Sequence, residues 1–343
     1  MLAELNAFNP NPLHATLSAL HVPFDQMLGT GACEQAVQRA VRQGRRVALV
    51  GATGTGKSSV IGHVLGPLVE GVAPLTVPVA LERPEVATEP AAFAEHLSAL
   101  IARWVRFAQP RDAGQVEAIT GRRRPATQRF SIAPSWLETK LELGYELQRA
   151  AEQPAASATA RITQAAQLLD LINADGLVPV IVLDDTDRWL ASSWQPDSVR
   201  LRQGFFGRIV RLIADELGAA AVIAVHPDYL TDPAYREAQG FLEPVVTVPS
   251  LPGPDAVAAM LRRRCELALD GIRGRSPATI PDPITPAGVA TLYDGYARAG
   301  TGNIRRDLML PATGALALAV DDLADVIDER HCVAALTENE AAG

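Results

Sequence analysis

The sequence predicts an α/β fold in which helices cover both faces of a parallel sheet, followed by a small all-helical domain. Short, fully apolar runs alternate with stretches of helical periodicity through the first part of the chain, which is typical of parallel strands buried on both faces. Beyond residue 252 the strand patterns stop and only helical patterns follow. We therefore expect a first domain over residues 1–249 and a helical domain over residues 250–343. The first domain would carry an N-terminal segment, 1–32, and an insertion at about 109–160.

Apolar runs mark the strands that we expect. They cover residues 47–50, 75–81, 180–183, 220–225 and 245–248. Pro78 interrupts the second run, and because proline cannot donate a hydrogen bond to a neighbouring strand, we expect that strand at a sheet edge. Helical periodicity predicts helices over residues 33–44, 57–65, 91–107, 162–174, 199–217, 255–269, 285–299, 303–320 and 321–335.

Composition excludes several classes of protein. The chain has 343 residues, and its 48% apolar content excludes a disordered chain. It carries 31 Lys+Arg against 39 Asp+Glu, a net charge of −8, which argues against a surface covered throughout with nucleic-acid-binding charge. Only Lys57 and Lys140 are lysines, so nearly all of the basic residues are arginines.

The sequence also argues against a membrane protein and a disulfide-linked protein. No apolar run approaches the about 20 residues that cross a bilayer, and the start of the chain lacks the pattern of a signal peptide. Cys33, Cys265 and Cys332 lie far apart, without the spacing of a disulfide framework or a zinc site. We therefore expect a cytoplasmic protein without a membrane partner.

A phosphate-binding loop is predicted directly after the first apolar strand. Its glycines allow backbone N–H groups to point at phosphate oxygens, and the helix that follows adds its dipole. Lys57 is expected to reach the β- and γ-phosphates of ATP, the Ser58 hydroxyl to bind Mg²⁺, and Ser59 to belong to the same site. A glycine-rich turn without a ligand is the alternative. The residues that match the pattern G-x-x-x-x-G-K-[ST] are Gly51, Ala52, Thr53, Gly54, Thr55, Gly56, Lys57 and Ser58.

A second motif follows the apolar run 180–183, which ends in Asp184 and Asp185. A carboxylate placed after a buried parallel strand lies at the carboxyl edge of the sheet, where the phosphate loop also begins. Asp184 is expected to hold Mg²⁺ through water, and Asp185 to orient or deprotonate the attacking water. A helix cap is the alternative role of Asp184, and it is compatible with metal binding.

With these two motifs in place, the chain resembles the AAA+ ATPases, and within them the branch of origin-recognition-like and transposition-regulator ATPases. The resemblance runs from about residue 24 to residue 332, apart from the insertion. Residues 51–58 resemble the Walker A motif, and Leu183-Asp184-Asp185 resembles Walker B. The resemblance implies hydrolysis of ATP with Mg²⁺, a helical lid over the nucleotide, and assembly into a ring or filament.

The resemblance also implies roles for three side chains. His226 stands where such proteins carry a polar sensor-1 residue that contacts the γ-phosphate or the attacking water; a histidine bonded to loop backbone is the alternative. Arg236 stands where the family places the arginine that reaches into a neighbour's ATP. Arg305, in a segment similar to sensor 2, would touch the γ-phosphate of its own subunit. Because arginines are so abundant, a solvated surface position is the alternative for both.

The Walker B motif departs from the pattern of this branch. Asp185 stands where most members carry a glutamate, and its side chain is one methylene shorter, which predicts slow hydrolysis. The Asp-Asp pair, with a following Asp187-Arg188, looks more like the STAND and KAP signalling NTPases. The sensor strand and the lid, however, lack the usual STAND signatures.

We therefore expect an ATP-binding, slowly hydrolysing ATPase that self-assembles under nucleotide control and regulates a DNA-directed process. Arg122, Arg123 and Arg124 would contact DNA phosphates, with a solvated loop as the alternative. The expected partners are further copies of the chain, DNA, and a transposase-type protein. The alternative function is a STAND-like signalling or defence switch that assembles with an effector protein.

Overall fold

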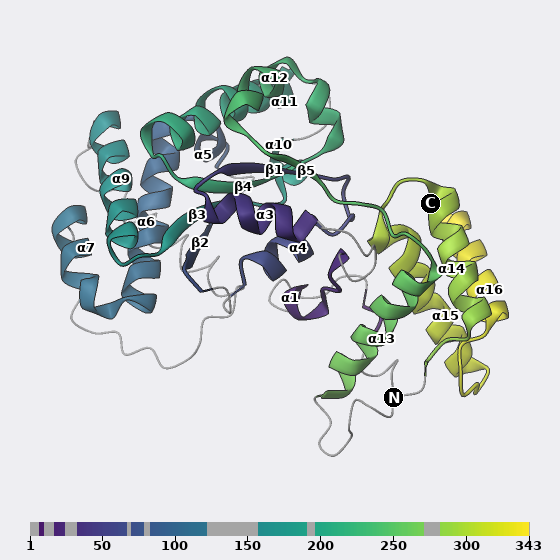
Figure 1. Cartoon of the computed structure of the whole chain (residues 1–343). Coiled ribbons are helices and arrows are strands. Elements are labelled where there is room, and N and C mark those ends of the chain that lie inside the picture. Colours follow the sequence, from purple (N-terminus) through teal and green to yellow (C-terminus); the bar gives the residue numbers. More distant parts are fainter. Residues whose placement is uncertain are drawn as a thin grey trace. The chain divides into compact units, whose positions relative to one another are not determined.

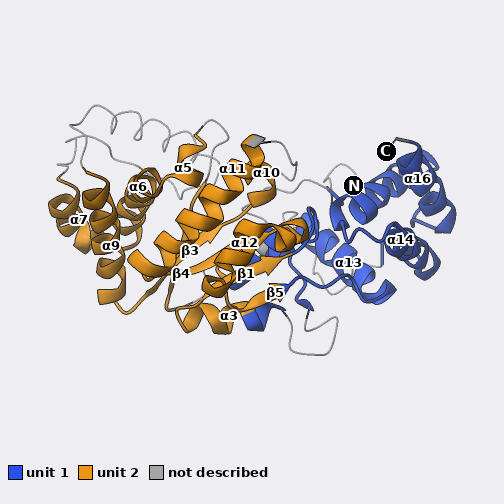
Figure 2. Ribbon diagram, turned by 90° about the horizontal axis from the view of Figure 1, so that it is seen from above, with its two compact units in different colours: residues 1–36, 51–64, 247–343 blue, residues 37–50, 65–246 orange. Residues whose placement is uncertain are grey.

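The computed structural model describes two compact units, which Figure 2 colours separately. Unit 1 comprises residues 1–36, 51–64 and 247–343, and unit 2 comprises residues 37–50 and 65–246. The phosphate-loop segment therefore groups with the C-terminal helices, whereas the sheet lies in unit 2. The residues that the structure describes are 7–9, 17–24, 33–66, 70–78, 83–121, 157–190, 196–270 and 282–342.

The sheet has five strands in the order β2-β3-β4-β1-β5. The pairs β2–β3, β3–β4 and β4–β1 are all parallel. This confirms the predicted parallel sheet, and β2 lies at an edge as expected. The strands are β1 (Arg46–Val50), β2 (Val72–Thr76), β3 (Val178–Leu183), β4 (Ala220–Val225) and β5 (Val245–Thr247).

Both faces of the sheet are covered, as the fully apolar strands predict. Ala48 and Ile181 belong to the main hydrophobic core, while Val47 and Val222, which point to the opposite face, are also fully buried. Figure 1 shows α10, α11 and α12 on one side of the sheet and α3 on the other. The helices are α3 (Cys33–Arg42), α5 (Glu85–Thr88), α6 (Pro90–Ala108), α7 (Ala113–Thr120), α9 (Ala158–Ala174), α10 (Thr186–Leu190), α11 (Pro196–Gly204) and α12 (Pro233–Ala238).

Among the described residues, unit 1 has two helices before β2 and four at its C-terminal end. The first two are α1 (Leu17–Leu20) and α4 (Lys57–Val64). The C-terminal four, which we call the lid, are α13 (Pro254–Asp270), α14 (Pro286–Ala299), α15 (Leu310–Asp321) and α16 (Glu329–Ala342).

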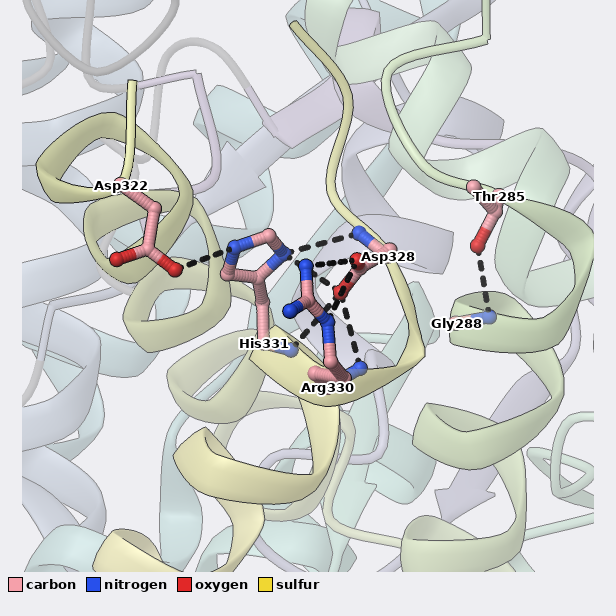
Figure 3. Close-up of polar contacts among 6 residues, drawn as sticks. All are labelled: Thr285, Gly288, Asp322, Asp328, Arg330 and His331. Carbon is pink, nitrogen blue, oxygen red and sulfur yellow. Dashed lines mark hydrogen bonds and ion pairs between the residues drawn. The ribbon is translucent and has the colours of Figure 1, made fainter. Parts of the chain in front are cut away.

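The last lid helix begins at a reciprocal cap rather than at residue 321 as predicted. The Asp328 carboxylate accepts hydrogen bonds from the backbone N–H groups of Arg330 (3.0 Å) and His331 (3.3 Å), and His331 Nδ1 accepts the N–H of Asp328 (3.1 Å; Figure 3). The other ring nitrogen of His331 contacts Asp322 (3.2 Å). These bonds hold residues 322–328 as a turn, in which Leu323 has a φ of 54°.

Three further elements differ from the prediction in their bounds. The strand expected over 75–81 is β2. Val77 still donates a bond to Val182 O (2.9 Å), and the strand ends there because Pro78 has no N–H to continue the pairing. The helix expected over 199–217 is α11 followed by π-helical turns at Phe205–Ile209 and Leu212–Glu216. The helix expected over 303–320 starts with a π-helical turn, Arg305–Met309, and continues as α15.

A buried ion pair joins α11 to α12 within unit 2. Arg202 Nε lies 2.7 Å from Asp232 Oδ2, and the two side chains are only 2% and 8% exposed. The other carboxylate oxygen of Asp232 accepts the N–H of Ala234 (2.9 Å) at the start of α12. The guanidinium also lies 5.9 Å from the centre of the Tyr229 ring. This pair fixes the segment that follows β4.

Replacing Arg202 with methionine tests this pair. The change leaves the Asp232 carboxylate buried without its cation, so we expect a loss of about 3–5 kcal/mol in the free energy of unfolding. Urea denaturation followed by circular dichroism measures it.

Arg208→Met is the matched control for this variant. Arg208 forms an ion pair with Glu89 (3.0 Å), but its side chain is 60% exposed. An exposed pair of this kind contributes about 0–1 kcal/mol. Equal losses in the two variants would show that the buried pair contributes no more to the free energy of unfolding than the exposed pair does.

Candidate functional site

The candidate site starts at the carboxyl edge of the sheet. The ends of β1, β4 and β3 are neighbours in the paired register. The chain continues from these three ends into Gly51, His226 and Asp184. Residues expected from three distant parts of the sequence therefore follow adjacent parallel strands, which is where α/β sheets bind ligands.

The phosphate loop has the backbone that its glycines allow. Gly54 and Gly56 have φ angles of 82° and 100°, a left-handed conformation in which any other residue would be strained. Lys57 is 6% exposed, and its ammonium donates hydrogen bonds to the carbonyl oxygens of Gly51 (2.7 Å) and Ala52 (3.1 Å). The cation therefore lies inside the loop, at the start of α4.

The segment between α14 and α15 contacts this loop within unit 1. The N–H of Ile304 donates to the carbonyl oxygen of Gly54 (3.1 Å). A Cβ on Gly54 would overlap the side-chain amide of Asn303, whose oxygen accepts the N–H of Arg306 (2.9 Å). Thr301 hydrogen-bonds to Asp307 across the same segment. The segment 301–307, which includes the sensor-2-like residues, is thus fastened to the phosphate loop.

The acidic pair after β3 lies in unit 2. Asp184 is partly buried and accepts the N–H of Asp185 (2.8 Å), while its backbone carbonyl faces the Trp189 indole N–H (3.4 Å). Asp185 is exposed and has a φ of 53°. Thr186, fully buried, donates its hydroxyl to the Ala224 carbonyl of β4 (2.5 Å). The start of α10 is therefore tied to the neighbouring strand, and this tie holds the two carboxylates at the strand end.

His226 and Arg236 lie in the same unit, on the segment that follows β4. His226 Nδ1 accepts the N–H of Asp228 (3.3 Å), and its ring lies 5.9 Å from that of Tyr229. This is the loop-backbone contact named above as the alternative, and the sensor role stays a prediction. Arg236 is exposed on α12, the helix anchored by Asp232.

The remaining expected arginines differ in where they lie. Arg305 is exposed at the start of the π-helical turn Arg305–Met309, two residues after Asn303. Arg122, Arg123 and Arg124 lie outside the residues that the structure describes.

Sequence reasoning missed a buried polar cluster behind the loop. His21 Nδ1 contacts the hydroxyl of Ser59 (2.9 Å), and His21 Nε2 contacts Glu34 Oε1 (2.9 Å), which also accepts the N–H of Phe24 (2.8 Å). Burial raises the pKa of Glu34, but the hydrogen bonds from His21 and Phe24 outweigh it and hold that pKa at about 2. A histidine inside the apolar run 20–24 was the available signal.

The described part of the chain has neither a preformed metal cluster nor a membrane-spanning helix. No group of three or more His, Cys, Asp or Glu side chains there is arranged to hold a metal ion. No helix in that part is long and apolar enough to cross a bilayer.

Comparison with known proteins finds likeness at the level of structure. No protein-family model matches the sequence, and no curated protein matches it. Among solved structures, one of the ORC2 protein of Aeropyrum pernix in ADPNP–ADP complexes is similar to this chain, with a TM-score of 0.54 and 16% sequence identity. The aligned region covers 98% of this chain and 72% of the ORC2 chain.

Two further structures have lower TM-scores. The ADP form of the same ORC2 protein matches 92% of this chain and 68% of its own, with a TM-score of 0.49 and 15% identity. Cdc6p from Pyrobaculum aerophilum matches 94% of this chain and 67% of its own, with a TM-score of 0.46 and 16% identity. The chain thus has the fold of the Aeropyrum ORC2 protein, and its resemblance to the origin-recognition-like AAA+ ATPases is confirmed at the level of the fold.

Proposed function

We propose that the chain is an AAA+ ATPase that binds ATP, hydrolyses it slowly and self-assembles under nucleotide control. The phosphate loop carries this proposal. Gly54 and Gly56 have the left-handed backbone that a phosphate-binding loop requires, and the Lys57 ammonium rests on two carbonyl oxygens that phosphate oxygens would replace as its partners. The ADPNP and ADP complexes of the Aeropyrum ORC2 protein support an adenine nucleotide as the ligand.

Mg²⁺ is the proposed metal partner of the nucleotide. Ser58 follows β1 and Asp184 follows β3, and both side chains offer the oxygen ligands that this small, hard cation prefers. The ion would supply neutralisation of charge on the β- and γ-phosphates. Asp184 would act through water, and Ser58 directly.

Hydrolysis is proposed to depend on Asp185. Its carboxylate is exposed and lies 3.7 Å from the Arg188 guanidinium, and its short side chain limits how far it reaches toward a water. His226 and Arg305 would contact the γ-phosphate in the same subunit, and Arg236 would act on the ATP of a neighbour. This division of labour makes hydrolysis a property of the assembly.

The chain is proposed to regulate a DNA-directed process by binding DNA. Its phosphate contacts would come from Arg122, Arg123 and Arg124. The fold shared with an ORC2 protein supports this choice. The second candidate is a switch that assembles with an effector protein, which the Asp184-Asp185 pair favours over the Asp-Glu form.

Lys57→Ala should weaken ATP binding about 10- to 100-fold, because it removes charge-assisted hydrogen bonds to the phosphates. Titration calorimetry of the full chain measures the change. Lys140, the only other lysine, provides the control Lys140→Ala, which should bind ATP like the unchanged protein. Unchanged affinity in the Lys57 variant would contradict the proposed site.

Asp185→Asn should slow ATP hydrolysis about 100-fold or more while leaving ATP affinity within about twofold, because a general base acts on the reaction rather than on binding. Asparagine tolerates the left-handed backbone of this position, so the fold should be kept. Phosphate release measures the rate. Asp197→Asn, at an exposed position in the first turn of α11, is the control; equal rates in the two variants would exclude Asp185 as the base.

Self-assembly should appear as faster sedimentation with ADPNP than with ADP or no nucleotide. A helical lid that closes on the γ-phosphate changes the surface offered to a neighbour. The result expected for Arg236→Ala is assembly with ADPNP but loss of hydrolysis, about 10³-fold or more. A monomer under every nucleotide condition would contradict the proposal.

A mixture of two variants provides the control for this experiment. Arg236→Ala subunits keep their own ATP site and Lys57→Ala subunits keep Arg236, so a mixture should regain hydrolysis if the arginine acts on a neighbour.

Adding DNA separates the two candidate functions. Salt-sensitive DNA binding that needs ADPNP, and that is lost when Arg122, Arg123 and Arg124 become glutamate, supports the DNA-directed function. Salt-insensitive assembly without DNA favours the effector switch.

A further inference from the structure

A row of three polar side chains ends on the helix that follows the phosphate loop. His21 lies between Glu34 on α3 and Ser59 on α4, with its Nε2 2.9 Å from Glu34 Oε1 and its Nδ1 2.9 Å from the Ser59 hydroxyl. The His21 and Glu34 side chains are only 4% and 7% exposed. All three residues belong to unit 1, as the phosphate loop does. The row therefore joins a buried carboxylate to the first turn of α4.

The carboxylate determines which ring nitrogen of His21 carries a hydrogen. Burial raises the pKa of Glu34, but hydrogen bonds from His21 and Phe24 hold it at about 2, so this side chain is ionised at neutral pH and can only accept hydrogen bonds. The hydrogen between the two groups is therefore assigned to Nε2 of His21. In the neutral imidazole Nδ1 is then an acceptor, and it receives the hydrogen bond that the Ser59 hydroxyl donates.

Ser59 lies in the turn of α4 that would meet a phosphate group. The N–H groups of the first turn of a helix point along the axis and out of the helix, and in a phosphate loop they bind phosphate oxygens. In α4 this turn comprises residues 57–59, because the N–H of Val60 already donates back to Gly56 O (3.0 Å). A change in the position of Ser59 therefore changes where these N–H groups point.

His21 contacts α4 at two successive turns. Besides the bond to Ser59, its ring lies 4.6 Å, centre to centre, from the ring of His63, with 31° between the two planes. Two contacts one turn apart restrict the rotation of α4 about its axis as well as its position. A serine in a helix can also bond to a carbonyl of the preceding turn. Because the single hydrogen of the Ser59 hydroxyl is used on His21, it is not available for such a bond.

We propose that His21 is a positioning residue of the ATP site. Held by Glu34, it fixes Ser59 and so the direction in which the N–H groups of residues 57–59 meet the phosphates. This inference rests on the proposed ATP site and adds to it a residue that lies outside both sequence motifs. In this role His21 needs no contact with the nucleotide, since it acts through Ser59 and the first turn of α4.

The affinity of the full chain for ADPNP tests this role in a double-mutant cycle. His21→Leu and Ser59→Ala should each weaken ADPNP binding about 10-fold, and the double variant should bind within about twofold of the weaker single variant, because the two side chains act as one unit. His21→Gln should restore the affinity to within about threefold, since an amide offers a donor for Glu34 and an acceptor for Ser59. Titration calorimetry measures the four variants.

Nitrogen NMR of the histidine rings tests the bonding itself, without nucleotide. At neutral pH the His21 ring should carry its hydrogen on Nε2, and Ser59→Ala should shift the Nδ1 signal because this variant removes the donor. A hydrogen on Nδ1 in the unchanged protein would contradict the assigned direction of the bonds and, with it, the positioning role.

His331 provides a matched control for the histidine variant. It is also buried in unit 1, and its ring nitrogens contact the Asp322 carboxylate (3.2 Å) and the N–H of Asp328 (3.1 Å) at the start of α16. His331→Leu should lower the midpoint of urea unfolding, as His21→Leu does, but should leave the affinity for ADPNP within about twofold. Equal losses of affinity would show that a general loss of stability explains the effect, and would overturn the proposal.

The outcomes separate failure of this inference from failure of the ATP site. If the losses in His21→Leu and Ser59→Ala are additive, or if His21→Leu binds ADPNP like the unchanged protein, His21 does not position the site. If the unchanged protein shows the expected ring but does not bind ADPNP, the proposed ATP site fails and the positioning role fails with it. If His21→Leu folds poorly, His21→Phe takes its place in the cycle, because it keeps a planar ring against His63 but has no nitrogen.

Discussion

The parallel pairing of β3, β4 and β1 is the constraint on which the rest of the structure depends. Because the three strands run in one direction and are neighbours, their carboxyl ends fall at one edge, and the residues after them begin there. Apart from Arg46 at the start of β1, these three strands carry only apolar side chains, so the polar groups of the candidate site come after the strand ends. The Thr186 hydroxyl on the Ala224 carbonyl then ties the start of α10 to β4, which keeps Asp184 and Asp185 at this edge. The buried Arg202–Asp232 pair ties the start of α12 to α11.

The phosphate loop belongs physically with the lid. It leaves the sheet at Gly51, and from there to residue 64 its contacts group it with residues 1–36 and the C-terminal helices. The backbone of Ile304 bonds to Gly54 on one side of the loop, and His21 bonds to Ser59 on the helix behind it. A ligand that orders this loop therefore acts directly on elements that are packed with the lid. Such an arrangement suits a protein in which nucleotide controls shape.

Much of the sheet and of the loop could be predicted from the sequence, because both leave strong local signals. Double burial produces unbroken apolar runs, and the left-handed positions of the loop demand glycine at Gly54 and Gly56. The turn at 322–328 could not be predicted, since its helix cap uses His331 where glutamate or glutamine is usual. The bonds from Arg264 to Asn9 and from Thr313 to Phe8 could not be predicted for another reason: they use backbone carbonyls, which every residue has, and they join positions 255 and 305 residues apart. Contacts of that kind have no signature in a single sequence.

In the proposed function, the short acid of the second motif favours one kind of activity. A carboxylate that reaches its water poorly slows hydrolysis, so the nucleotide-bound state lasts longer. A long-lived state is useful where the bound shape is the output, as in assembly on a partner, and of little use where rapid turnover is the output. The bond from Ile304 to Gly54 joins the phosphate loop to the segment before α15, so a bound nucleotide would stabilise one arrangement of unit 1. Asp185 would then set how long the arrangement persists, while Lys57 and the loop decide whether it forms.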